Sequence, residues 1–191
     1  MNILLLTSDF LPNVGGMATH ALELARAHAA NGHNVHLVHP VYGPGERRIE
    51  PMEGFTVHKL FVDKRTPRIK HLFYILEVRK YILALHEREK FDVLHWHDMT
   101  PNCWTTFTLK KSLPLVWTNH TSNYLELYES TAGRRKIRFF LGHAEAIISP
   151  SRELFEKSTA TGISSDRNFY IPNGVDAEKF RPDNSFGVID K

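Results

Sequence analysis

The chain opens with an alternation of strand and helix patterns that few folds can accommodate. Asn2–Ser8 is a continuous apolar run of the kind found in a strand buried on both faces. A Gly15-Gly16 loop follows, and residues 17–31 place small and aliphatic side chains at helical spacing. Asn31-Gly32 ends this helix with a left-handed cap, and Asn34–His39 is the next strand. This order predicts a βαβ unit with a parallel strand pair and a right-handed crossover.

The same alternation continues to the end of the chain. The further predicted strands are Phe55–Leu60, Asp92–Trp96, Leu115–Thr118, Ala146–Ser149 and Asn168–Ile171. Helices are predicted between them over 69–89, Pro101–Lys111, a basic region around 134–138, and 152–160 with Ser151 as its N-cap. Residues 40–54 are rich in Pro and Gly and are predicted to form a long loop. We therefore expect an α/β fold with a doubly wound, mostly parallel, Rossmann-like sheet of about seven strands.

Composition is that of an ordinary globular protein and argues against several other classes. The chain has 191 residues, of which 42% are hydrophobic and 24% charged. A formal charge of +3 is too small to indicate a nucleic-acid partner. No apolar run approaches the ~20 residues of a membrane span, and Ile3–Leu6 is too short for a secretory signal. The single cysteine, Cys103, is expected to be a buried thiol, so a reducing compartment fits best and we expect a cytoplasmic protein.

Polar residues recur directly after several of the predicted strands. Asp9 follows the first strand, His97-Asp98 follows a later one, and Asn119 to Ser122 and Pro150-Ser151 follow two more. Because the carboxyl ends of parallel strands meet at one edge of a sheet, these residues are expected to line a common open crevice there.

Metal binding is considered and set aside at this stage. His95 and His97 lie two residues apart on a strand and so share a face. No third ligand at a recognisable spacing accompanies them, and we expect no metal.

The Gly15-Gly16 pair suggests a site for an anion. Glycines let the backbone approach a ligand closely, and the N-terminus of the following helix favours negative charge. The spacing is not Gly-x-Gly-x-x-Gly, and the second strand ends in His39-Pro40 and not in an acid. Both features argue against a dinucleotide site.

An ordered set of motifs resembles the N-terminal domain of the retaining GT-B glycosyltransferases of family 4, and the resemblance covers nearly the whole chain. The last of these motifs, Ile-Pro-Asn-Gly-Val-Asp, is the most specific. The motifs are Gly15-Gly16 with His20, the segments 31–35, 92–98, 118–120 and 149–151, and Ile171 to Asp176.

The resemblance implies a role for each candidate residue. His120 would be catalytic beside the transferred sugar, and the backbone of Gly15 and Gly16 would bind the donor diphosphate. The implied acceptor-binding residues are Asp9, His20, His97, Asp98, Thr121 and Ser151. The implied interdomain positions are Asn173, Gly174 and Asp176. The donor would be a nucleotide-sugar, and no cofactor is implied.

The resemblance also implies a division of the chain. Residues 1–175 would form the acceptor-side domain, and 176–191 an interdomain linker or the start of a missing C-terminal, donor-binding domain. The paired-glutamate signature that the family carries in that second lobe does not occur here. We therefore expect this lobe alone to transfer no sugar at a useful rate.

Several alternatives stay open. The chain could be a stand-alone module that binds a sugar or nucleotide, or a dinucleotide-dependent epimerase or oxidoreductase domain. The acceptor could be a lipid, a saccharide or a small molecule. The basic cluster is either a solvated helix face or a peripheral contact with the inner face of a membrane. This cluster consists of Arg134, Arg135, Lys136 and Arg138.

Overall fold

The computed structural model describes residues 1–178 except 14, 63–69, 100 and 121. It contains one eight-stranded sheet in the order β3-β4-β2-β1-β5-β6-β7-β8. All neighbouring strands run parallel except β3 and β4. The strands are β1 Asn2–Leu6, β2 Asn34–Tyr42, β3 Arg48–Met52, β4 Phe55–Val62, β5 Val93–Trp96, β6 Leu115–Thr118, β7 Ala146–Ser149 and β8 Asn168–Tyr170. The expected α/β class and mostly parallel sheet are confirmed.

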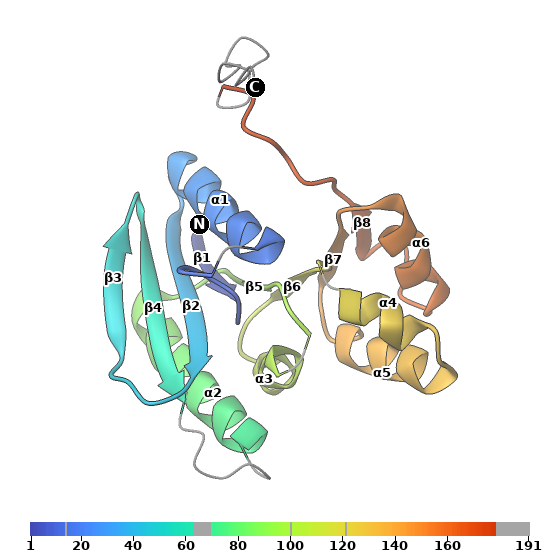
Figure 1. Ribbon diagram of the computed structural model, residues 1–191, viewed down its shortest axis with the longest axis horizontal. Coiled ribbons are helices and arrows are strands. Elements are labelled where there is room, and N and C mark those ends of the chain that lie inside the picture. The colour runs from blue at the N-terminus through green and yellow to red at the C-terminus, as the bar shows by residue number, and fades with distance from the viewer. Residues whose placement is uncertain (14, 63–69, 100, 121, 179–191) are drawn as a thin grey trace, which may run out of the picture.

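Six helices connect these strands in the described part of the chain (Figure 1). They are α1 Gly16–Ala30, α2 Lys70–Glu89, α3 Asn102–Leu109, α4 Ser122–Tyr128, α5 Thr131–Leu141 and α6 Arg152–Ala160. Gly32 has the predicted left-handed conformation, with φ of 77°. The hydroxyl of Ser151 accepts a hydrogen bond from the Leu154 amide at 3.2 Å, so the predicted N-cap of α6 is confirmed. Cys103 is buried, as expected.

The strand count of about seven was one too low, because the segment 40–54 is not a plain loop. The strand β2 runs on through Pro40 to Tyr42, and β3 lies within the segment. The carbonyl of Val38 accepts a hydrogen bond from the Thr7 amide, on the β1 side of β2. Backbone groups two residues apart in a strand point to the same side, so the nitrogen of Pro40 also faces that side, beyond the last residue of β1.

The added strand β3 is an exposed edge strand that pairs antiparallel with β4 through a two-residue turn. Met52 pairs with Phe55 across Glu53 and Gly54, and Gly54 has φ of 85°. Pro51 is tolerated because an edge strand has one side without a partner.

The strand β1 is buried on both faces, which divides the core into two layers. Ile3 and Leu5 pack on one face with Ala21 and Ala25 of α1. Leu4 and Leu6 point to the other face, where they join side chains of α2, α3 and α5. Alternation along one continuous apolar strand thus places α1 and α2 on opposite faces of the sheet.

The order of connection reverses beside β1. The chain moves from β1 through α1 to β2 on one side, and returns through α2 to β5 on the other. This is the topological switch point of a doubly wound sheet, where ligands bind beyond the carboxyl ends of the strands. In the described part of the chain, no helix is both long and apolar enough to cross a bilayer.

A chain of polar rings, two of them buried, links β2, β4 and α2. A ring nitrogen of His36 lies 2.8 Å from one of His58, whose other nitrogen lies 2.7 Å from the Tyr81 hydroxyl. Burial, with smaller effects of His36 and Arg88, lowers the pKa of His58 to about 4. His58 is therefore neutral at pH 7 and must stay neutral to remain in the core.

We predict that acid destabilises the fold between pH 6.5 and pH 4. A histidine whose pKa is lowered by folding binds its proton in the unfolded chain at a higher pH than in the folded one. Its contribution to stability is therefore fully present above pH 6.5 and is lost as pH falls toward the folded pKa. At pH 5 each such buried ring, His58 and His95 among them, lowers the free energy of unfolding by about 2 kcal/mol relative to its value at neutral pH.

Urea unfolding at pH 7.5 and pH 5 measures this effect. The variant His58→Gln lacks one of the titrating rings, so its free energy of unfolding should fall less between the two pH values. An equal loss in the variant and the unmodified chain would show that His58 does not carry this share.

Candidate active site at the strand switch point

The loops after β1 and β5 are tied together at the switch point. The Ser8 amide donates to Oδ2 of Asp98 at 2.6 Å, and the Asn102 side-chain amide donates to the same oxygen at 3.0 Å. Asp98 is only 4% exposed, and burial raises its pKa while these two donors oppose that shift. The carboxylate thus fixes the position of both loops, whereas its contact with an acceptor stays a prediction.

Three histidines converge from different elements at this edge. His20 comes from α1, His97 from the end of β5, and His120 from the end of β6. The ring centroid of His20 lies 4.1 Å from that of His120 and 5.4 Å from that of His97. The ring centroids of His97 and His120 are 5.6 Å apart. His97 is fully buried, and the other two are half-buried. We call His20, His97 and His120 the histidine cluster.

This grouping differs from the pair expected on the sequence. His95 and His97 do lie close, with ring centroids 4.4 Å apart. However, Nε2 of His95 lies 2.6 Å from the Thr118 hydroxyl, so its ring is engaged within the sheet. Two further histidines, His20 and His120, lie beside His97. Spacing along the chain could not indicate them, because they come from α1 and from the end of β6.

The histidine cluster is electrically neutral at pH 7. Burial lowers the pKa of His120 to about 3, with a smaller contribution from His20. Burial likewise lowers the pKa of His20, and that of His97 lies well below its ordinary value because of burial and the neighbouring histidines. Each ring therefore offers one N–H donor and one acceptor nitrogen, and not a positive charge.

Several ring nitrogens in the histidine cluster lack a hydrogen-bond partner in the described part of the chain. They are Nε2 of His20, both nitrogens of His97 and Nε2 of His120. The adjacent Asn119 is fully buried, and neither polar atom of its side-chain amide has a partner there. Buried polar groups are normally paired, so unpaired ones at one edge indicate a place built for an external ligand. Asn119 belongs to a quoted motif but was not among the predicted site residues.

The glycine pair opens the N-terminus of α1 beside this edge. Gly15 is the N-cap, and no side chain caps the helix. Gly15 is extended, and an added Cβ there would make an ordinary contact with Asp9 at 3.4 Å. A Cβ on Gly16 would meet nothing within 4 Å. Neither position needs glycine for the fold itself, so the absent side chains leave room for something outside the chain.

The other predicted site residues are more dispersed. Asp9 is half-buried, and its Oδ1 accepts from the Asn13 amide at 3.2 Å. Ser151 lies at the carboxyl end of β7, where its hydroxyl caps α6. Thr121 lies outside the described residues. The predicted interdomain residues are exposed on the extended segment that leaves the sheet after β8 (Figure 1), and they are Asn173, Gly174 and Asp176.

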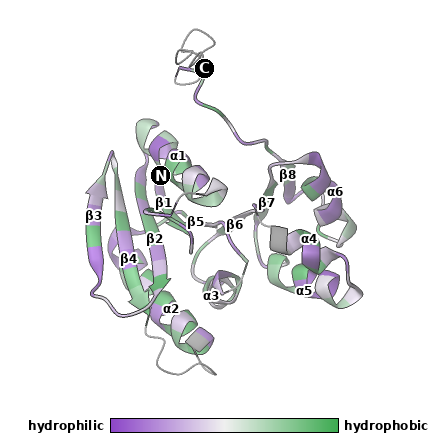
Figure 2. Cartoon of the chain, in the orientation of Figure 1, coloured by the Kyte–Doolittle hydropathy of each residue, from purple (hydrophilic) through white to green (hydrophobic). Residues whose placement is uncertain are grey.

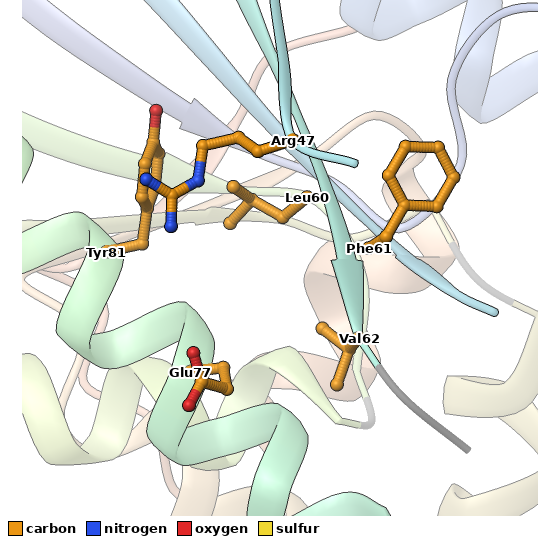
Figure 3. A pocket seen from close by; sticks show the side chains of 6 residues that line it. All are labelled: Arg47, Leu60, Phe61, Val62, Glu77 and Tyr81. Atoms are coloured by element: carbon orange, nitrogen blue, oxygen red, sulfur yellow. The ribbon is translucent and has the colours of Figure 1, made fainter. Parts of the chain in front are cut away.

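A small pocket lies between the carboxyl end of β4 and α2 (Figure 3). Its volume is ≈ 190 Å³, below the range of typical ligand pockets. The Arg47 guanidinium that lines it lies 4.6 Å from the centre of the Tyr81 ring. This cation already has a partner, so the pocket offers little to a ligand.

The pattern of residues 14–179 matches the profile of Glycosyltransferase Family 4. The chain belongs to this family. The match covers most of the chain, and so confirms the resemblance inferred from the motifs.

Curated relatives agree with the family. Two of them are subunits of phosphatidylinositol N-acetylglucosaminyltransferase. The chain is 25% identical over 191 residues to the one from Arabidopsis thaliana, and 25% identical over 190 residues to the one from Homo sapiens. Each match covers 95% of this chain, but only 41% and 38% of the two relatives. The chain thus spans about two fifths of the length of these proteins.

Solved structures share the fold at low sequence identity. Sucrose-phosphate synthase from Thermosynechococcus elongatus matches with a TM-score of 0.69 and 15% identity, over 94% of this chain and 50% of that one. Anabaena HepE in complex with UDP and glucose matches with a TM-score of 0.62 and 14% identity, over 93% of this chain and 46% of that one. A UDP-N-acetylglucosamine 2-epimerase from Rickettsia bellii matches with a TM-score of 0.58 and 13% identity, over 89% of this chain and 44% of that one. These likenesses show the fold alone, and the fold serves more than one reaction.

Proposed function

We propose that this chain is the acceptor-side lobe of a retaining glycosyltransferase that uses a nucleotide-sugar donor. One observation carries the proposal. At the switch point of a family 4 chain, neutral histidines with unpaired nitrogens lie beside a helix that begins with glycine and has no side-chain cap. Residues 1–175 are the lobe, and 176–191 lead toward a second lobe that holds most of the donor. The chain alone is then inactive, because half of the donor site lies outside it.

In this proposal the donor diphosphate lies at the start of α1. The first N–H groups of a helix have no partner within it, and the helix dipole adds partial positive charge there. The first turn of α1 contains no acidic residue, although the side chain of Asp9 lies close to Gly15. Negative charge grows on the diphosphate as the sugar leaves, so fixed donors facing it stabilise the transition state.

His120 then faces the transferred sugar. Its ring is neutral and half-buried, and its Nε2 has no partner among the described residues. Such a ring can exchange hydrogen bonds with sugar hydroxyls without repelling the positive charge that develops at the anomeric carbon. The companion rings of His20 and His97 fix its position, and Asp9, Thr121 and Ser151 complete the acceptor side.

For the acceptor we propose a lipid at a membrane surface. The names of the two curated relatives include phosphatidylinositol. The chain also presents exposed aromatic side chains on α3 and α5, where Trp104 is 40% and Phe139 53% exposed. The rings of Phe107 and Phe139 lie 5.2 Å apart and join the two helices into one surface.

The helix α5, which carries part of this aromatic surface, also carries exposed cations. Arg135, Lys136 and Arg138 are exposed on α5, whose residues include both strongly hydrophilic and strongly hydrophobic ones (Figure 2). Arg134 is excluded from this group because its guanidinium donates to the Tyr128 carbonyl at 2.8 Å. Aromatic rings beside basic residues suit the interface of an anionic bilayer.

A stand-alone binding module and a dinucleotide-dependent epimerase or oxidoreductase are the alternatives. The epimerase alternative remains because a UDP-N-acetylglucosamine 2-epimerase shares this fold. Family membership favours sugar transfer over both, because it rests on the sequence pattern of most of the chain.

We predict that His120→Ala abolishes turnover in the two-lobed enzyme. Loss of a group that faces the reacting sugar should lower kcat by about 100-fold or more, with little effect on folding because the ring is half-buried. Turnover of nucleotide-sugars and the melting temperature measure the two effects. His33→Ala, at the opposite end of the strands before β2, is the control and should keep full activity. Unchanged turnover in His120→Ala would remove this residue from the site.

We predict that Gly16→Leu raises the KM for the donor. The added side chain would enter space that is open in the structure and would keep the diphosphate from the helix N-terminus. Gly16→Ala adds only a Cβ and should have a smaller effect, so the two variants form a graded pair. An unaltered donor KM in Gly16→Leu would show that this loop faces elsewhere.

We predict that the chain binds anionic vesicles through α5. Arg135→Glu with Arg138→Glu should weaken sedimentation with phosphatidylinositol vesicles by about 10-fold or more, since each basic residue near the surface contributes about 1 kcal/mol. Arg48→Glu, on the edge strand β3, is the control reversal. Equal binding to neutral phosphatidylcholine vesicles, or an effect of Arg48→Glu as large as that of the α5 pair, would contradict the assignment.

A further inference from the structure

We propose that the histidine cluster is a binding site for a divalent transition-metal ion of the Zn²⁺, Co²⁺ or Ni²⁺ class. Metal binding here stands on the geometry alone. Its consequence, that a bound ion blocks sugar transfer, rests on the proposed function of His120.

The three ligand atoms are already close. One ring nitrogen from each of His20, His97 and His120 lies within 4.8 Å of the other two. Metal–nitrogen bonds in tetrahedral zinc sites are about 2.0–2.1 Å long, so each ring has to move by roughly 1 Å to coordinate one ion. Motions of this size need only small side-chain rotations.

No internal hydrogen bond opposes this movement at the unpaired nitrogens of the described cluster. These nitrogens include both of His97, whose side chain is fully buried. A buried imidazole with neither nitrogen paired is an unusual arrangement, and a metal ion would supply the missing partner. The backbone of His97 is meanwhile held to β1, because its amide donates to the Leu6 carbonyl at 3.2 Å.

The chemistry of the donor set selects the ion. Three neutral imidazoles suit zinc, cobalt, nickel and copper, whereas calcium and magnesium require oxygen ligands.

The site would have an open fourth position. Both His20 and His120 are half-buried, so the histidine cluster reaches solvent on one side. Three protein ligands and one exchangeable position are typical of open metal sites and not of closed structural ones. An ion held there takes up a ring nitrogen of His120, so metal and donor sugar compete for the same side chain.

Binding is tested by adding Co²⁺ to the chelator-treated, 191-residue chain and following the visible absorption of the ion. We expect saturable binding of one equivalent, displacement by one equivalent of Zn²⁺, and no competition from a large excess of Mg²⁺. The variants His20→Ala and His120→Ala should each weaken binding by about 10-fold or more. His33→Ala is the control, because His33 and His28 form a separate pair with ring centroids 5.9 Å apart.

Two results would overturn the metal site. One is the absence of saturable Co²⁺ binding to the folded chain. The other is binding that survives both His20→Ala and His120→Ala but is lost in His33→Ala. Circular dichroism verifies that each variant is folded, and two separate ligand variants keep the test decisive if one of them is not.

The consequence for activity is tested in the two-lobed enzyme. Micromolar Zn²⁺ should inhibit turnover, and a chelator should restore it. Failure of Co²⁺ binding sinks the metal site and leaves the proposed function untouched. Unchanged turnover in His120→Ala removes His120 from the transferase site and leaves the metal site untouched.

Discussion

The central strand β1 sets the geometry on which the site depends. Its side chains are buried on both faces, so α1 and α2 must cover opposite sides of the sheet. The chain therefore leaves β1 in one direction and returns to β5 beside it from the other. The two loops diverge at that point, and the buried Asp98 carboxylate ties them through the Ser8 amide. The edge of the candidate site is thus built on a packing constraint and fixed by one buried side chain.

Burial at this edge decides the chemistry that the histidines can do. Burial lowers the pKa of His97, and those of His20 and His120, from their ordinary values. Neutral rings with unpaired nitrogens favour hydrogen bonding to a sugar and coordination of a transition-metal cation. They do not supply positive charge, which in the proposed mechanism comes from the start of α1. The proposed metal site and the proposed transferase site follow from one physical property of the same rings.

Local periodicity was enough to predict most of the fold. Strands buried on both faces give continuous apolar runs, and every expected strand was found within two or three residues of its predicted ends. The strand β3 was missed because Pro51 and the nearby glycines indicate a loop, while its pairing with β4 is a tertiary event on an exposed edge. The Glu53-Gly54 turn was the available signal for this hairpin. Polar residues after the strands also predicted the right edge of the sheet.

The sequence by itself determined the α/β architecture, the family and the edge of the sheet where the candidate site lies, because these follow from short-range patterns and ordered motifs. Only the tertiary structure decided which histidines meet. From the sequence His97 is paired with His95, two residues away, but a hydrogen bond with Thr118 occupies that ring. His97 lies beside His95 and also meets His20 of α1 and His120 after β6. Such grouping depends on how α1 crosses the edge of the sheet, and no spacing along the chain encodes that crossing.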